Sequence, residues 1–226
     1  MKENRFLMPV LTACLFIFSR FLLPRVTTVS FAQAILDLVW CAAACRWILK
    51  KRSTFSFHKP VHPLVPTGLL LLFLGIILCG NRYIPATTPS ENTFIGITDL
   101  VLLGPVAEEW VFRGLPLADC RKERPSVIWF SVFLSSLLFA VSHSRSIQML
   151  CAFGFSLMAF CLLWFSSSMV WPVVFHILSN ALGLLLPSPP VWLCVCVLLT
   201  ACVLLYAAFC IYAPMKKRGR SRNRNA

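Results

Sequence analysis

Residues 104–116 read GPVAEEWVFRGLP and place two adjacent carboxylates, Glu108 and Glu109, and one cation, Arg113, inside an apolar segment. The whole chain has 226 residues, of which 58% are hydrophobic and 13% are charged. A soluble domain is about half apolar and about a quarter charged, so the composition predicts a polytopic membrane protein. A carboxylate is costly inside a bilayer, and its presence there indicates function.

Apolar segments of the length that crosses a bilayer, about 20 residues, recur along the chain. Eight candidates lie at about 6–23, 31–49, 64–80, 94–117, 127–147, 149–166, 169–186 and 191–212. No small-residue cleavage site follows the first, so we expect it to be retained. The fold class is therefore all-α: one transmembrane domain at 1–213, with the site in the bundle interior and a motif-bearing core at about 94–186, followed by a basic cytoplasmic tail at 214–226.

The basic residues are concentrated at the ends of the apolar spans. The formal net charge of +13 is compatible with nucleic-acid binding, but this distribution is typical of orientation signals in membrane proteins. In the eight-span scheme, sixteen of the 21 Lys and Arg residues fall on one side. We therefore expect both termini to be cytoplasmic, and we expect the lipid bilayer, not nucleic acid, as the partner.

The three charges of the fourth span divide by their spacing. Residues four apart share a helix face and can pair, so Arg113 is expected to neutralise Glu109. Glu108 has Phe112 at the equivalent position, which leaves Glu108 facing elsewhere and suited to chemistry.

Two further polar pairs, again four residues apart, lie in apolar spans: Phe139 with His143, and His176 with Asn180. Hydrogen bonding between helices is the structural explanation of such residues, and a functional site is the alternative. At 1.5 Å per residue, Glu108 and Asn180 both come to about 15 Å from the cytoplasmic ends of their spans, but His143 comes to about 24 Å. His143 would be level with Glu108 if its helix started after Val127 or tilted.

In chain order, these residues resemble the three motifs of the CAAX prenyl endopeptidase and bacteriocin-processing family (CPBP, also called Abi). The motifs as they stand here are Glu108-Glu109-x-x-x-Arg113, Phe139-x-x-x-His143 and His176-x-x-x-Asn180. The resemblance covers about residues 94–186 and implies an intramembrane endopeptidase, in which Glu109, Arg113 and Phe139 have supporting roles.

Carried over position by position, the resemblance implies that Glu108 is the general base that activates a water and that His143 helps to orient that water. His176 and Asn180 would line an oxyanion hole for the tetrahedral intermediate. The family has been described both as glutamate-dependent and as metal-dependent, and a zinc ion would take Glu108, His143 and His176 as ligands. We expect no cofactor, because asparagine is a poor zinc ligand and a Glu–His pair suffices to activate water.

Other protease signatures are absent from the sequence, since it contains neither HExxH nor the Gly-x-Ser-x-Gly nucleophile elbow. Two readings without proteolysis stay open: a membrane interaction or immunity protein of the same family, and a small transporter. For the protease we expect a membrane-associated peptide or protein substrate. The family name is compatible with a substrate that carries a lipid group. The short loops and the small size resemble those of prokaryotic members of the family. We therefore expect the protein in the inner membrane of a bacterium.

Overall fold

The computed structural model describes residues 7–26, 30–51, 62–81, 94–118, 124–143, 146–186 and 188–222. Throughout these residues the regular structure is helical, and they contain no strand. Seven continuous helices are α1 (Leu7–Val26), α2 (Ser30–Lys51), α3 (Leu64–Asn81), α7 (Pro125–Val141), α8 (Ser146–Ser166), α9 (Val170–Leu185) and α10 (Val191–Arg222). An eighth pass is composite: α4 (Phe94–Thr98), η1 (Asp99–Leu103), α5 (Gly104–Glu109), η2 (Trp110–Gly114) and α6 (Leu115–Ala118).

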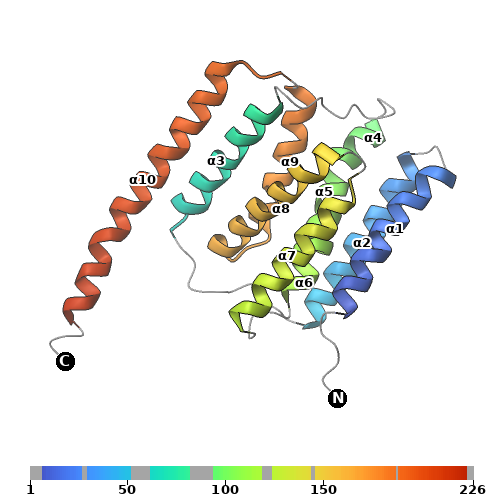
Figure 1. Cartoon of the computed structure of the whole chain (residues 1–226), viewed down its shortest axis with the longest axis horizontal. Coiled ribbons are helices and arrows are strands. Elements are labelled where there is room, and N and C mark those ends of the chain that lie inside the picture. Colours follow the sequence, from blue (N-terminus) through green and yellow to red (C-terminus); the bar gives the residue numbers. More distant parts are fainter. Residues whose placement is uncertain are drawn as a thin grey trace.

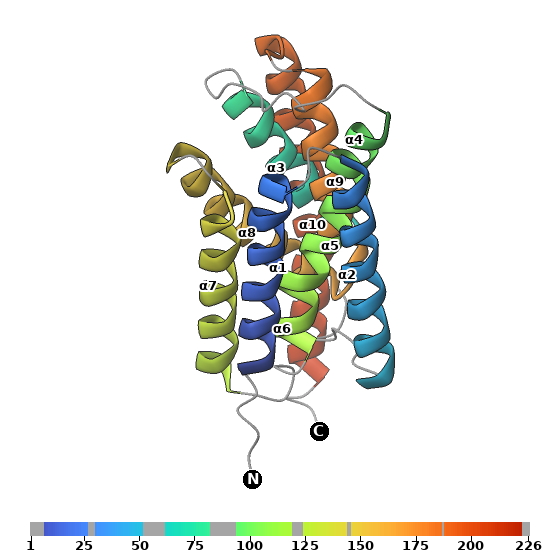
Figure 2. The same ribbon diagram turned by 90° about the vertical axis from the view of Figure 1, so that its right-hand side faces the viewer.

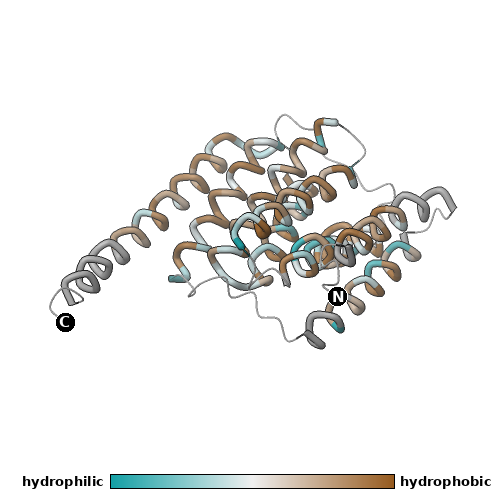
Figure 3. The backbone as a smooth tube through the Cα atoms, turned by 60° about the horizontal axis from the view of Figure 1, so that its bottom comes forward, coloured by the Kyte–Doolittle hydropathy of each residue, from teal (hydrophilic) through white to brown (hydrophobic). Residues whose placement is uncertain are grey.

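The eight passes run up and down through one bundle, and α1 begins at the end of the bundle where α10 finishes (Figures 1 and 2). An even number of passes is what the sequence predicts. Three helices, Leu64–Asn81, Ser146–Ser166 and the Val191–Cys210 part of α10, are long and apolar enough to cross a membrane. The other apolar helices of the described residues are shorter. Figure 3 shows hydrophobic residues along most of the length of the passes.

One predicted boundary is wrong. The fifth span was expected to reach residue 147, but α7 ends at Val141, where the polar run Ser142-His143-Ser144 begins. The last span was expected to end near residue 212, and the apolar part of α10 ends at Cys210, although the helix itself continues to Arg222. Lys and Arg are good helix formers, so the helix backbone continues into the basic segment.

Helices α3 and α10 pack closely because two glycines of α3 face α10. A Cβ atom at Gly68 would lie 2.9 Å from the Leu205 side chain, and one at Gly75 would lie 2.7 Å from that of Leu198. Such distances are shorter than side-chain contacts allow, so any larger residue would separate the two helices.

The pass that carries the two glutamates contains two π-helical segments, η1 and η2, one on each side of α5. The Gly104 amide bonds to the Asp99 carbonyl five residues earlier, and the Leu115 amide bonds to that of Trp110. Pro105 and Pro116 follow these amides directly and have no N–H to donate. In each segment one carbonyl therefore lacks its usual backbone donor, and π-helical turns of this kind recur at functional sites.

Candidate active site

The two glutamates of α5 meet the histidine of α9 in the bundle interior. One oxygen of Glu109, Oε1, accepts a hydrogen bond from Arg113 Nη1 at 3.0 Å and another from His176 Nδ1 at 2.9 Å. Glu109 is fully buried, and Arg113 is 2% exposed. The ion pair that the four-residue spacing predicts is therefore present, and His176 joins it.

Glu108 lies on the other side of the His176 ring. A carboxylate accepts, so His176 Nδ1 donates its proton to Glu109 and Nε2 is the nitrogen that remains for Glu108. The distance from His176 Nε2 to Glu108 Oε2 is 3.6 Å. The side chain of Glu108 is 14% exposed, whereas that of Glu109 has no exposure. The adjacent carboxylates thus have different surroundings, and Glu108 is the more accessible one.

Asn180 lies one helical turn after His176, and its amide is engaged with the composite pass. Asn180 Nδ2 donates to the backbone carbonyl of Leu100 at 2.9 Å. In the π-helical register the donor to that carbonyl would be Pro105, which has no N–H. The asparagine amide supplies the missing hydrogen bond and ties α9 to η1.

Ser135 of α7 supplies a missing hydrogen bond to η2, as Asn180 does to η1. This role of Ser135 was not predicted from the sequence. Its hydroxyl donates to the carbonyl of Phe112, whose donor in an α-helix would be Pro116. The two prolines were the available signal, because each one marks a carbonyl that needs a side-chain donor. Together, Asn180 and Ser135 fix the irregular pass that presents the glutamates.

His143 lies just after α7, two residues beyond its last helical residue. Its Nδ1 donates to the Phe139 carbonyl at 3.0 Å, and its ring lies 5.1 Å from the Phe139 ring, centroid to centroid. The Phe139 ring is also 5.9 Å from that of His176. Among the described residues, Phe139 therefore lies between His143 and His176, and His176 contacts the two glutamates.

The expected explanation for the depth of His143, a helix that starts after Val127, is wrong, because α7 starts at Pro125. Figures 1 and 2 show the end of the bundle at which α1 begins. At that end, α7 reaches further out than the turn between α8 and α9. The fourth turn of α7 consequently lies beside the second turn of α9, as the contact of Phe139 with His176 requires. Depths counted from helix starts are not comparable between these two helices.

The three side chains named as zinc ligands, Glu108, His143 and His176, are not assembled as a ligand set. Among the described residues, no group of three or more His, Cys, Asp or Glu side chains is arranged to hold a metal ion. In this arrangement the three side chains do not form a zinc ligand set.

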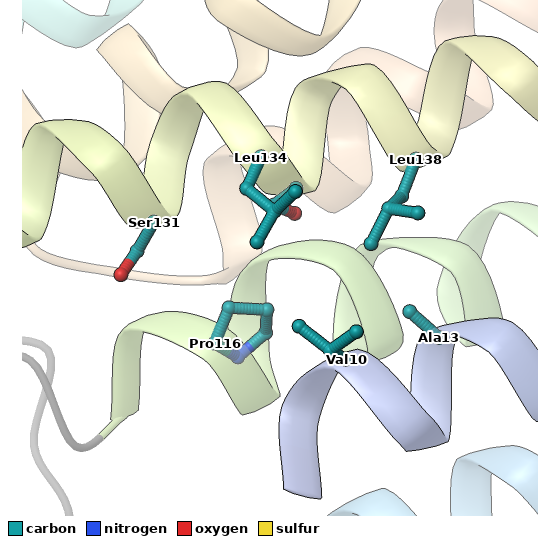
Figure 4. Close-up of a pocket in the computed structure, with 7 residues that line it drawn as sticks. Val10, Ala13, Pro116, Ser131, Leu134 and Leu138 are labelled. Atoms are coloured by element: carbon teal, nitrogen blue, oxygen red, sulfur yellow. The ribbon is translucent and has the colours of Figure 1, made fainter. Parts of the chain in front are cut away.

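A separate apolar pocket lies between α1, α6 and α7 and is lined by residues that include Val10, Pro116 and Leu138 (Figure 4). Two serines also line it, and both hydroxyls are engaged with backbone carbonyls: Ser131 with Val127, and Ser135 with Phe112. The pocket is lined by no titratable side chain, so it is not a second centre of acid–base chemistry.

Comparison with known proteins locates a family match on the same part of the chain. Residues 90–182 match the family model described as type II CAAX prenyl endopeptidase Rce1-like, and this range contains all three motifs. An uncharacterized 24.3 kDa protein of Escherichia coli is 26% identical over 153 residues, and the match covers 62% of this chain and 70% of that protein. No solved structure matches the chain.

Proposed function

We propose that this membrane protein, which carries an Rce1-like domain at residues 90–182, is an intramembrane endopeptidase that uses Glu108 to activate water. The Rce1-like family is a peptidase family, and all three motifs of this chain lie within the matched range. The substrate we propose is a peptide or protein associated with the membrane. We place the protein in the inner membrane of a bacterium, with both termini in the cytoplasm.

The observation that carries the proposal is the cluster of Glu108, Glu109, Arg113 and His176. The two carboxylates and the guanidinium have a combined formal charge of −1, so a protonated His176 makes the cluster neutral. The imidazolium form also has a proton on Nε2, directed to the side of Glu108.

The first step we propose is attack by water. Glu108 accepts a proton from a water molecule at the more exposed side of the cluster, and the water oxygen forms a bond to the carbonyl carbon of the scissile peptide. The carbonyl π electrons move to the oxygen, which becomes an oxyanion. Glu108 is then neutral and has the proton that the departing amine requires.

The second step breaks the C–N bond. The oxyanion re-forms the carbonyl, the C–N electron pair moves to nitrogen, and Glu108 returns the proton to that nitrogen. During both steps, the Nε2–H of His176 and the second N–H of Asn180 stabilise the oxyanion. Glu109 is a positioning residue, because it holds Nδ1 of His176 and thereby directs Nε2 to the reaction.

His143 has a supporting role in this scheme. Its Nδ1–H is used by the Phe139 carbonyl, which leaves Nε2 as an acceptor that can orient a water. We propose that no metal is needed, because Glu108 and His176 between them supply the base and the electrophile.

The test is cleavage by the purified protein in liposomes. Membrane peptides, with and without a lipid group, are incubated with the wild type and with Glu108→Ala, His143→Ala and His176→Ala, and products are identified by mass spectrometry. Ser179→Ala is the matched control on α9, because among the described residues the Ser179 hydroxyl bonds within its own helix, to the Phe175 carbonyl.

We expect cleavage by the wild type and by Ser179→Ala, and a loss of about 10²-fold or more in Glu108→Ala and His176→Ala. Cleavage that survives both Glu108→Ala and His143→Ala contradicts the mechanism. Activity that is unchanged by strong chelators supports the metal-free scheme, and loss of activity that zinc restores contradicts it.

A further inference from the structure

The buried guanidinium of Arg113 has only part of its hydrogen-bonding capacity satisfied by Glu109. Nη1 donates to Glu109 Oε1, but among the described residues Nη2 has no hydrogen-bond partner, and neither has Glu109 Oε2. The pair is therefore held through one oxygen and one nitrogen, whereas arginine and a carboxylate often form two parallel bonds. A cation that is 2% exposed needs a further source of stabilisation.

The ring of Phe139 lies where that stabilisation is needed. The Arg113 Cζ atom is 4.5 Å from the centroid of the ring, well within the distance of about 6 Å at which an aromatic face attracts a cation. Phe139 is itself 2% exposed. Because both groups are removed from water, the attraction is stronger than it would be at a surface.

The same ring contacts both histidines of the site. Phe139 lies 5.1 Å from His143 and 5.9 Å from His176, centroid to centroid, and packs edge-on against Phe112 at 5.3 Å. It joins α7 to η2 and to α9, the elements that supply Arg113 and His176. No other ring of the described residues is recorded over the Arg113 guanidinium.

We propose that Phe139 is a positioning residue whose ring face stabilises the Arg113 guanidinium in addition to the carboxylate of Glu109. With Glu109 on one nitrogen and the ring over the central carbon, the guanidinium has one orientation. That orientation fixes Glu109, and Glu109 fixes His176. The consequence for cleavage rests on the proposed function, whereas the interaction between the ring and the cation does not.

Fluorination of the ring separates its electrostatic role from its shape. Mono-, di- and trifluorophenylalanine withdraw increasing negative charge from the ring face while they leave the side chain nearly isosteric. Each is incorporated at position 139 of the full chain by stop-codon suppression, and thermal unfolding is followed in detergent. Phe175 is the matched control position, because it is fully buried and packs against Phe155 and Phe73 with no recorded cation contact.

We expect the unfolding temperature to fall stepwise with fluorine number at position 139, by about 2 to 4 °C in total, and to change by less than half as much at position 175. The near-parallel contact of Phe139 with Phe155 does not explain such a fall, because stacked rings are not weakened by opposite quadrupoles. In an Arg113→Met background the series at position 139 should become flat. A flat series with Arg113 present, or an equal fall at positions 139 and 175, overturns the proposal.

The rate of cleavage gives a second readout in the same variants. If the protein cleaves a membrane peptide, kcat should fall with fluorine number at position 139 while KM stays unchanged, because the ring acts on the alignment of His176 and not on substrate binding. A stepwise fall in stability with constant kcat overturns the positioning role. Absence of cleavage in the wild type contradicts the proposed function, and the unfolding series then still decides whether Phe139 stabilises Arg113.

Discussion

Replacing Glu109 with glutamine should be far more damaging to stability than replacing Arg113 with methionine. In Glu109→Gln, the buried guanidinium loses the carboxylate to which it is hydrogen-bonded and keeps the face of Phe139 and the charge of Glu108, with which it has no hydrogen bond among the described residues. In Arg113→Met, Glu109 keeps the Nδ1–H of His176 at 2.9 Å. The asymmetry follows because, within the described part of the chain, the Glu109 carboxylate has two hydrogen-bond donors and the Arg113 guanidinium has one acceptor.

The magnitudes follow from burial. Removing one partner of a buried ion pair costs about 3–5 kcal/mol, so Glu109→Gln should lower the unfolding temperature by about 10 °C. Arg113→Met loses one charge-assisted hydrogen bond while its partner keeps another, so its cost should be about 1–3 kcal/mol. In the double variant no buried cation is left unpaired, and its cost should be below that of Glu109→Gln alone.

The assay is unfolding of the four proteins in one detergent, followed by circular dichroism as denaturant or temperature is increased. A double-mutant cycle gives the coupling energy between positions 109 and 113. The reasoning is refuted if Arg113→Met is the more destabilised single variant, or if the cost of the double variant equals the sum of the two single costs.

Two further predictions use matched controls elsewhere in the bundle. Ser135→Ala leaves a buried carbonyl of η2 without its side-chain donor and should cost about 1–3 kcal/mol. Ser179→Ala, whose buried hydroxyl bonds to the Phe175 carbonyl of its own helix, should stay within about 0.5 kcal/mol of wild type, and equal effects would contradict the role of Ser135. Gly75→Ala places a Cβ atom 2.7 Å from Leu198 and should be at least about 1 kcal/mol less stable than Gly154→Ala, where nothing lies within 4 Å. Unfolding of the two glycine variants in the same detergent measures this difference, and a Gly75→Ala protein as stable as Gly154→Ala would show that α3 and α10 are not closely packed in solution.

Local spacing explains the parts of the site that the sequence predicted. Glu109 and Arg113 are four residues apart in one helix, so their pairing needs no knowledge of other helices. The helical passes were likewise visible as apolar runs bounded by polar segments.

Contacts between distant segments explain what the sequence did not predict. His176 bonds to Glu109 across 67 positions of the chain, and no helical period carries that information. The stacking of Phe139 on Arg113 and the hydrogen bond from Ser135 to η2 are of the same kind. In the sequence, the two π-helical segments were indicated only by Pro105 and Pro116. Each proline removes a backbone donor from one carbonyl, but the sequence does not say which side chain of a neighbouring helix replaces that donor.

The central claim is that the two adjacent glutamates have separate tasks, with Glu108 in the reaction and Glu109 in the structure. The most direct test measures cleavage rate and unfolding temperature in parallel for Glu108→Gln and Glu109→Gln. We predict that Glu108→Gln loses cleavage by about 10²-fold or more while its unfolding temperature stays within about 3 °C of wild type, and that Glu109→Gln unfolds about 10 °C lower. A Glu108→Gln protein that cleaves at the wild-type rate, or that is destabilised as strongly as Glu109→Gln, would contradict the claim.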